Sequence, residues 1–417
     1  MRIRIIIITL ALCGVTMIGL SLMINPNPIP EEDCVFNTVF GETELDSTLF
    51  IEVSEEVKST IQEGLIWIEK AQHPDGGWGA GFHSNQREMD PHKVPADPAT
   101  TAMVSMALLR TGSNLEQGPY SKQLLKATEF LLSAVENAKR GSITELTGTQ
   151  IQRKLGNNID IVLTTQYFNN LVEKLDEDSK YYNRVYRAID LAVDLLENKM
   201  DKEGKVKGAG WAGVLQSAFA TSALEASDAN GIAIDKEKLA YAKNYQSSNY
   251  DPVSESIETK DGAGIMLYSV SGSVRANAKD ARIAKEKIKK AKEEGLLEEV
   301  EVLSYKSLMK AGVDQKAALK LEAASKVYES AKVRVQEDEV VRGFGNNGGE
   351  EFLSFLQTGE SLVIGQDNAW AKWFDSMSAN LVNIQNPDGS WNGHHCITSP
   401  VFCTATCLLI LSINEDI

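Results

Sequence analysis

The chain has 417 residues, of which 43% are hydrophobic and 24% are charged. This composition supports one or two domains with a large core and differs from that of a disordered chain. The formal net charge is −16, and a surface of that sign repels phosphates, so we expect no nucleic-acid partner.

The N-terminal segment differs from the rest of the chain. Arg2 and Arg4 precede an apolar stretch over residues 5–24, which is long enough to cross a bilayer core of ~30 Å. Basic residues at this end favour export of the downstream chain. We therefore predict a signal peptide or membrane anchor with a linker over residues 1–30, and an extracytoplasmic protein, membrane-anchored or secreted. A buried core helix is the structural alternative.

Residues 31–53 are predicted to form an irregular extension, since they are acidic and show no helical period. The helices begin after Ser54, where a serine followed by two glutamates is typical of a helix N-terminus. From there residues 54–417 are predicted to form a single domain of about six repeated units.

One phrase occurs near both ends of that domain. Residues 72–78 read Gln-His-Pro-Asp-Gly-Gly-Trp, and residues 385–391 read Gln-Asn-Pro-Asp-Gly-Ser-Trp. In each copy an apolar-periodic helix leads into the Gln, and Pro-Asp-Gly ends it. A second helix then starts at Asp97-Pro98 or at Ser399-Pro400, where a capping residue precedes proline. Such repetition indicates a fold made of like units.

Weaker copies of this unit lie between the two clear ones. They predict six helices of one kind, with starts near Asp97, Asp160, Ser217, Ala263, Glu350 and Ser399. We expect Trp78 and Trp391 to be buried against neighbouring helix ends.

The repeated phrase resembles the repeat of squalene and oxidosqualene cyclases, which protein prenyltransferase β-subunits share in looser form. The resemblance covers roughly residues 50–415. It implies an all-α fold, an α/α toroid in which inner helices ring a central cavity and outer helices surround them. It also implies that the cavity binds an apolar or mixed ligand, such as an isoprenoid, a lipid or a peptide.

The acid of the cyclases has no counterpart here. In that family an Asp-x-Asp-Asp-Thr-Ala motif protonates the substrate through its middle Asp, and the nearest phrase in this chain is residues 97–102. Ala99 stands at the acid position. We therefore expect no cyclase activity, and we predict that Asp97 is a helix cap.

The prenyltransferases bind zinc through Asp and Cys of a late repeat and His of the last. By this resemblance Cys403 stands where their His would be, Glu350 falls near the Asp position and Phe352 near the Cys position. The ligand set is therefore altered and incomplete.

The residues themselves also suggest a metal. All five His lie in the first and last repeats, which a closed ring would make neighbours, and zinc favours His, Cys and carboxylate ligands. The candidate ligands are His83, His92, His394, His395, Cys396 and Cys403. In the alternative, the His residues cap helices and pack the seam, and Cys396 forms a disulfide with Cys34. Candidate catalytic acids are Asp160, Glu350 and Glu351.

Residues 275–342 have a different composition. They contain 16 Lys or Arg and 13 Asp or Glu, a net charge of +3. We predict a charged helical insertion of two or three exposed helices, joined near Gly295 and Gly312. It is either a solvated face or an arm that binds a protein partner.

These patterns support two functions of different kinds. The first is a ligand-binding module without cyclase activity, favoured by Ala99 and by the charged insertion. The second is an enzyme, either a metal-assisted transferase or hydrolase or a polysaccharide lyase, favoured by the His, Cys and Glu residues.

Overall fold

The computed structural model describes residues 49–342 and 348–416. The chain divides into two compact units, residues 1–33 and 34–417, and all the described elements belong to the second. Their regular structure is helical, and β-pairing is confined to isolated bridges such as Phe82 with Thr149. The predicted membrane or signal segment over residues 5–24 lies outside the described residues. No helix within the described residues is both long and apolar enough to span a membrane.

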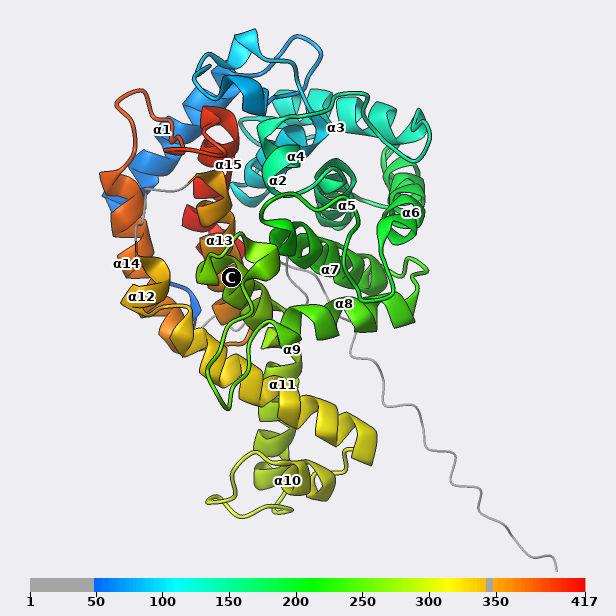
Figure 1. Ribbon diagram of the computed structural model, residues 1–417, viewed down its shortest axis with the longest axis vertical. Coiled ribbons are helices and arrows are strands. Elements are labelled where there is room, and N and C mark those ends of the chain that lie inside the picture. Colours follow the sequence, from blue (N-terminus) through cyan, green and yellow to red (C-terminus); the bar gives the residue numbers. More distant parts are fainter. Residues whose placement is uncertain (1–48, 343–347, 417) are drawn as a thin grey trace, which may run out of the picture. The chain divides into compact units, whose positions relative to one another are not determined.

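Six helices contact one another in a closed cycle (Figure 1). Each packs against the next in chain order, and the last packs against the first. The members are α2 (Pro98–Arg110), α5 (Ile159–Val172), α7 (Gly213–Ala229), α9 (Met266–Glu293), α13 (Gly349–Ile364) and α15 (Pro400–Leu411). All six begin within four residues of the predicted starts. Every residue of α2, α5, α13 and α15 is buried, as expected for helices packed on all sides.

Five other long helices of the described chain cover this cycle. In α6, for example, the buried residues fall at helical spacing along one stripe, from Val185 to Leu196, and most of the other residues are polar, with Leu191 as an exposed exception. Such a helix buries one side only. The covering helices are α1 (Glu55–Lys70), α3 (Ser121–Glu136), α6 (Tyr182–Lys199), α8 (Lys236–Ser248) and α14 (Ala369–Asn383). Short elements fill the connections: α4 (Gln150–Lys154), α12 (Asp338–Val341), and 3-10 turns at His83–Asn85, Pro91–Lys93, Lys260–Gly262 and Ile413–Asp416.

The two clear copies of the repeated phrase form the same turn. Trp78 and Trp391 are fully buried, which confirms their predicted packing. The indole N–H of Trp78 donates to the carbonyl of Ile68 at 2.9 Å, and that of Trp391 donates to the carbonyl of Leu381 at 2.9 Å. The ring therefore fastens each turn to the end of the helix that precedes it.

The glutamine of each copy joins its turn to the next covering helix. Gln72 Nε2 donates to the carbonyls of Gly76, within the turn, and Gln123, in α3. Gln385 Nε2 donates to the carbonyls of Gly389 and of Thr60 in α1. Because α14 and α1 lie at opposite ends of the chain, this second bond links the last repeat to the first.

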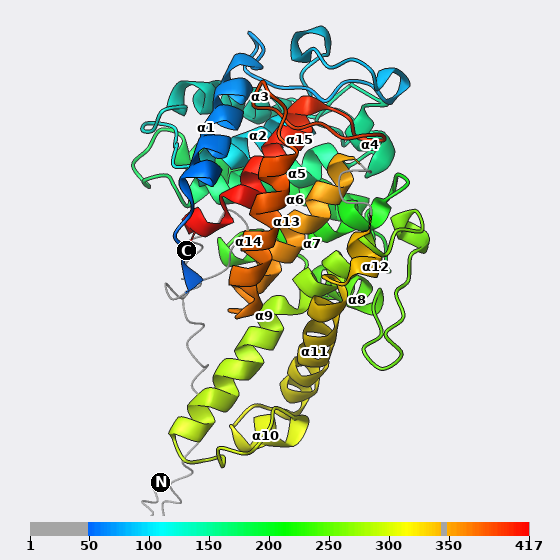
Figure 2. The same ribbon diagram turned by 90° about the vertical axis from the view of Figure 1, so that its left-hand side faces the viewer.

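The charged segment over residues 275–342 begins inside the cycle. The helix α9 already starts at Met266, and the first part of the segment is not exposed as predicted, because Arg275 is buried and pairs with Glu225 of α7 at 3.3 Å. Farther on, the end of α9, α10 (Tyr305–Lys310) and the first part of α11 (Gln315–Arg334) surround a small apolar core of their own (Figure 2). The second part of α11 packs in the main core through Tyr328 and Ala331. Gly295 and Gly312 follow α9 and α10 with positive φ.

Candidate metal site

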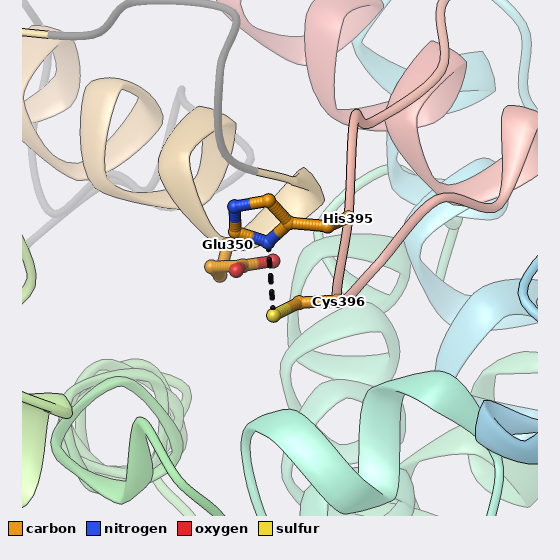
Figure 3. Close-up of side chains that lie close together, drawn as sticks. All are labelled: Glu350, His395 and Cys396. Carbon is orange, nitrogen blue, oxygen red and sulfur yellow. Dashed lines mark hydrogen bonds between the residues drawn. The ribbon is translucent and has the colours of Figure 1, made fainter.

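Three potential metal ligands from two segments converge at the N-terminal end of α13 (Figure 3). Glu350 is the second residue of that helix, and His395 and Cys396 lie in the loop before α15. One carboxylate oxygen, one imidazole nitrogen and the thiol sulfur all lie within 4.8 Å of one another. His395 Nδ1 is 3.1 Å from Cys396 Sγ. Glu350 is buried, Cys396 half-buried and His395 exposed, so one side of the group faces solvent.

The loop that carries His395 and Cys396 is held from three directions. The amide of Gly349 donates to the carbonyl of Ile397 at 2.9 Å, which ties the loop to the start of α13. Gln86 Nε2 donates to the carbonyl of Cys396 at 3.0 Å. Gln150 of α4 accepts from the amide of Thr398 at 2.7 Å. Cys396 itself has a φ of 66°, a conformation that costs free energy for a residue with a side chain and persists where its surroundings impose it.

A buried lysine completes the cluster. The Lys154 ammonium lies 3.2 Å from Glu350 Oε1 and donates to Cys396 Sγ at 3.6 Å. It also lies over the ring of Tyr268, 5.5 Å from the centroid. The Lys154 side chain is 7% exposed. A buried lysine needs a partner for its charge, and the Glu350 carboxylate provides it.

The polar atoms of this cluster are incompletely satisfied. Glu350 Oε2 is buried and accepts no hydrogen bond among the described residues, which is uncommon for a buried carboxylate oxygen. Burial, together with the charge of Glu350, raises the pKa of the Cys396 thiol, against the effect of Lys154. A cation bound between the Glu350 carboxylate and Cys396 Sγ would give Glu350 Oε2 a partner and would favour the thiolate form of Cys396.

These donors fit zinc. Zinc binds carboxylate oxygen and imidazole nitrogen at about 2.0–2.2 Å and thiolate sulfur at about 2.3 Å. Tetrahedral bonds of those lengths place ligand atoms roughly 3.3–3.7 Å apart, and the present donors all lie within 4.8 Å of one another. The His395 nitrogen and the Cys396 sulfur, now 3.1 Å apart, would need to separate by a few tenths of an ångström.

The other predicted ligands lie elsewhere. Cys403 is buried in α15 and its thiol donates to the carbonyl of Ile397 at 3.6 Å. The His394 ring lies edge-on to that of His395, with centroids 6.0 Å apart. His83 lies edge-on to Trp211, and the His92 ring is 5.8 Å from that of His73. Of the six candidate ligands, His395 and Cys396 therefore meet, and they meet Glu350.

Within the described part of the chain Cys396 is a free thiol. Its alternative pairing with Cys34 stays a prediction, because Cys34 lies outside the described residues. Burial raises the pKa of the Cys403 thiol, and the charge of Glu350 raises it further.

Two of the three candidate acids are not in the cluster. Asp160 lies at the start of α5, where its Oδ1 accepts from the amide of Ala99 at 3.3 Å and its Oδ2 accepts from Gln152 at 2.8 Å. It thus joins two neighbouring helix ends. The second of these acids, Glu351, is buried in the first turn of α13.

Asp97 accepts from the amide of Thr100 at 2.8 Å, which confirms it as the cap of α2.

Sequence reasoning missed Lys154. It appears in the sequence only as one basic residue in a polar stretch, with no spacing that relates it to residues 350 or 396. The contact exists because the cycle of helices brings α4 next to the loop before α15, 242 residues away.

No family model matches the chain, and no curated protein sequence matches it. Among solved structures, it is similar to the apo type II terpene cyclase MstE from Scytonema, with a TM-score of 0.46 and 12% identity over 86% of this chain and 98% of that one. A variant of that enzyme in complex with geranylgeranyl dihydroxybenzoate (substrate) matches with a TM-score of 0.40 and 12% identity, over 86% of this chain and 97% of that one. A variant in complex with merosterolic acid A (product) matches with a TM-score of 0.42 and 13% identity, over the same shares.

Proposed function

We propose that this protein is an α/α toroid enzyme with a catalytic zinc site formed by Glu350, His395 and Cys396, and that it carries out metal-assisted transfer or hydrolysis. The closed cycle of six helices supports the toroid. The observation that carries the zinc site is the convergence of three different donor atoms within 4.8 Å. One of them belongs to the Glu350 carboxylate, whose buried Oε2 accepts no hydrogen bond from the described residues.

The number of ligands favours catalysis over a structural role. Structural zinc sites have four protein ligands, whereas catalytic sites have three and leave one position open. Among the residues that the structure describes, three protein donors meet here, and the exposed His395 lies on the solvent side. Zinc bound there would polarise a substrate carbonyl or phosphoryl oxygen, or activate a water molecule.

The chain's own residues would fix the geometry of such a site. Glu350 is held by the first turn of α13, and Tyr268 donates to its Oε1 at 3.5 Å. The loop bonds from Gly349, Gln86 and Gln150 hold Cys396 and His395 beside it. Ligands fixed by surrounding hydrogen bonds in this way keep the orientation that a metal requires.

A second candidate function is a metal-free binding module for an apolar or mixed ligand. The observation that favours it is the position of Lys154, whose ammonium already contacts both Glu350 and Cys396. In this alternative the lysine is the permanent counter-ion of the cluster, and the ligand lies in the cavity of the toroid. The absence of a cyclase acid at Ala99 agrees with both candidates.

Metal analysis of the purified full chain separates them. We expect about one zinc per chain, and we expect Cys396→Ser and His395→Ala each to weaken zinc binding by at least about tenfold, since each removes a ligand. His394→Ala is the matched control, because it removes the adjacent exposed imidazole that is not part of the group. Zinc binding that survives the first two changes, or is lost with the control, would contradict the proposal.

A further inference from the structure

We propose that Lys154 is a placeholder cation: its ammonium occupies the metal position in the metal-free protein, keeps the site assembled there, and leaves when zinc binds. The inference rests on the proposed zinc site and adds how the occupancy of that site is regulated. Lys154 would thus be a positioning residue that acts through Glu350 and Cys396.

The contacts of Lys154 coincide with those that a metal would need. Its Nζ lies 3.2 Å from Glu350 Oε1 and 3.6 Å from Cys396 Sγ, two of the three proposed ligands. A zinc ion bound to the same carboxyl group and the same sulfur would lie within a few ångströms of this ammonium, and two cations so close together in a buried site repel each other strongly. We therefore expect zinc to displace the lysine.

Burial explains why a placeholder is needed. Glu350 is fully buried and Glu351, in the same turn, is 1% exposed. A buried carboxylate without a counter-charge is strongly unfavourable. Sites that rely on the metal alone for this charge unfold when it is removed. Lys154 supplies a positive charge from within the chain, so the cluster remains paired without the metal.

The surroundings of Lys154 hold it in this position. The short helix α4 begins with a reciprocal cap between Thr149 and Gln152 and ends at Lys154. The carbonyl of Lys154 accepts from the amide of Ala212 at 2.7 Å. The four-carbon side chain is flexible, and the Tyr268 ring lies beside it as a surface over which the ammonium can move while it keeps a cation–π contact. The backbone is fixed, therefore, and only the side chain has to move.

The test is the zinc affinity of Lys154→Met, a substitution that keeps an unbranched apolar chain, shorter by the terminal nitrogen, and removes the charge. We expect affinity to rise by at least about tenfold, because zinc no longer has to displace a hydrogen-bonded cation. Arg153→Met is the matched control, since it removes an exposed cation one residue away in the same helix, and its affinity should equal that of the unaltered protein. If Lys154 has a purely structural role, the zinc affinity of Lys154→Met should be equal to that of the unaltered protein or lower.

A second measurement reports the placeholder role in the metal-free state. After removal of metal with a chelator, the unaltered protein should keep its helical circular dichroism and its melting transition. Metal-free Lys154→Met should melt at a lower temperature, and zinc should raise its melting temperature more than that of the unaltered protein. Adding Glu350→Gln to Lys154→Met should restore the metal-free melting temperature, because the uncompensated charge is gone.

The outcomes separate the inference from the proposed function. If the unaltered protein binds zinc through Cys396 and His395, and Lys154→Met binds it equally or more weakly, the placeholder role is wrong and the zinc site stands. If neither protein binds zinc, both are wrong. Should Lys154→Met fail to fold without metal, Lys154→Gln replaces it, since its amide still donates to Glu350 without a charge. The same gain in affinity is then required.

Discussion

Asp160 and Asp97 form a pair of fully buried carboxyl groups where the ends of α5 and α2 meet. Burial, followed by the charge of Asp97, raises the pKa of Asp160 to about 7. Burial also raises the pKa of Asp97, against the hydrogen bonds from Thr100 and Ala80. Because burial raises the pKa of both carboxyl groups, the folded pair keeps a proton at a pH where the unfolded chain has lost it.

This pair predicts that the protein loses stability as pH rises from about 4 to about 7. The folded-state pKa of Asp160, about 7, lies above its ordinary value of 3.8, so the folded protein binds more protons than the unfolded chain in that window. The stabilisation is complete below pH 4 and is lost as pH passes 7. It amounts to roughly 4 kcal/mol at most.

Asp160→Asn should therefore flatten this part of the stability profile. Urea unfolding at several pH values between 4 and 8 measures it, and Asp375→Asn on the exposed side of α14 is the control. An equally steep decline in Asp160→Asn would show that another group is responsible.

Individual residues of the candidate site were predictable, but their grouping was not. His395 and Cys396 are two of the six predicted metal ligands, whereas Glu350 was predicted as a candidate catalytic acid, although its carboxylate is also a side chain that zinc binds. Which of the His and Cys residues meet depends on the loop conformation, with Cys396 at positive φ. Residue type gives no indication of that conformation. The contact of Lys154 is a product of tertiary packing alone.

The turn at the end of each repeat is the element in which sequence and structure agree best. Pro-Asp-Gly requires a positive φ at its glycine, and Gly76 and Gly389 have φ of 94° and 90°. Both tryptophan amides donate to a threonine of the following helix at 2.9 Å, Thr101 in one copy and Thr404 in the other. Local chemistry determines this turn, so seven residues of sequence were enough to predict it.

Trp391→Ala should destabilise the protein by about 3–5 kcal/mol, the range for large buried aromatic side chains. The change removes a fully buried ring and its hydrogen bond to Leu381. Trp211→Ala is the matched control, because that ring is 57% exposed, and its effect should be small. Thermal or denaturant unfolding measures both, and similar losses from the two changes would refute the packing role of the turn.

The start of α9 shows where composition misleads. The charge-rich sequence begins near Arg275, and this change in composition predicted the start of an exposed insertion. The helix instead runs through that point from Met266 to Glu293, and its first half is buried. Buried ion pairs such as Arg275 with Glu225 make charged residues possible inside the packed helices, and composition alone cannot distinguish them from charges in solvent.

At the scale of the whole molecule, the closed cycle makes distant parts of the chain interdependent. Arg110, at the end of α2, donates to Glu360 of α13 at 2.8 Å and to the carbonyl of Leu409 in α15 at 2.9 Å. It therefore connects the first helix of the cycle to the last two. An open array of repeats would have no such contact, and its ends could unfold separately.

Arg110→Met should lower stability by about 3–5 kcal/mol, the cost of removing one partner of a buried ion pair. Because the contact closes the cycle, we expect the loss to shift one cooperative unfolding transition as a whole, with circular dichroism and tryptophan fluorescence changing together.

The matched comparison is Arg184→Met, which removes the more exposed pairs of α6 with Glu129 and Glu136 and should cost about 1 kcal/mol or less. In the double variant Arg110→Met with Glu360→Gln the loss should be smaller than the sum of the two single losses, since the two side chains contact each other and either change alone already breaks their ion pair. Two separated transitions in Arg110→Met would instead mean that the ends of the cycle unfold independently, and that the contact between α15 and α2 contributes little to the fold.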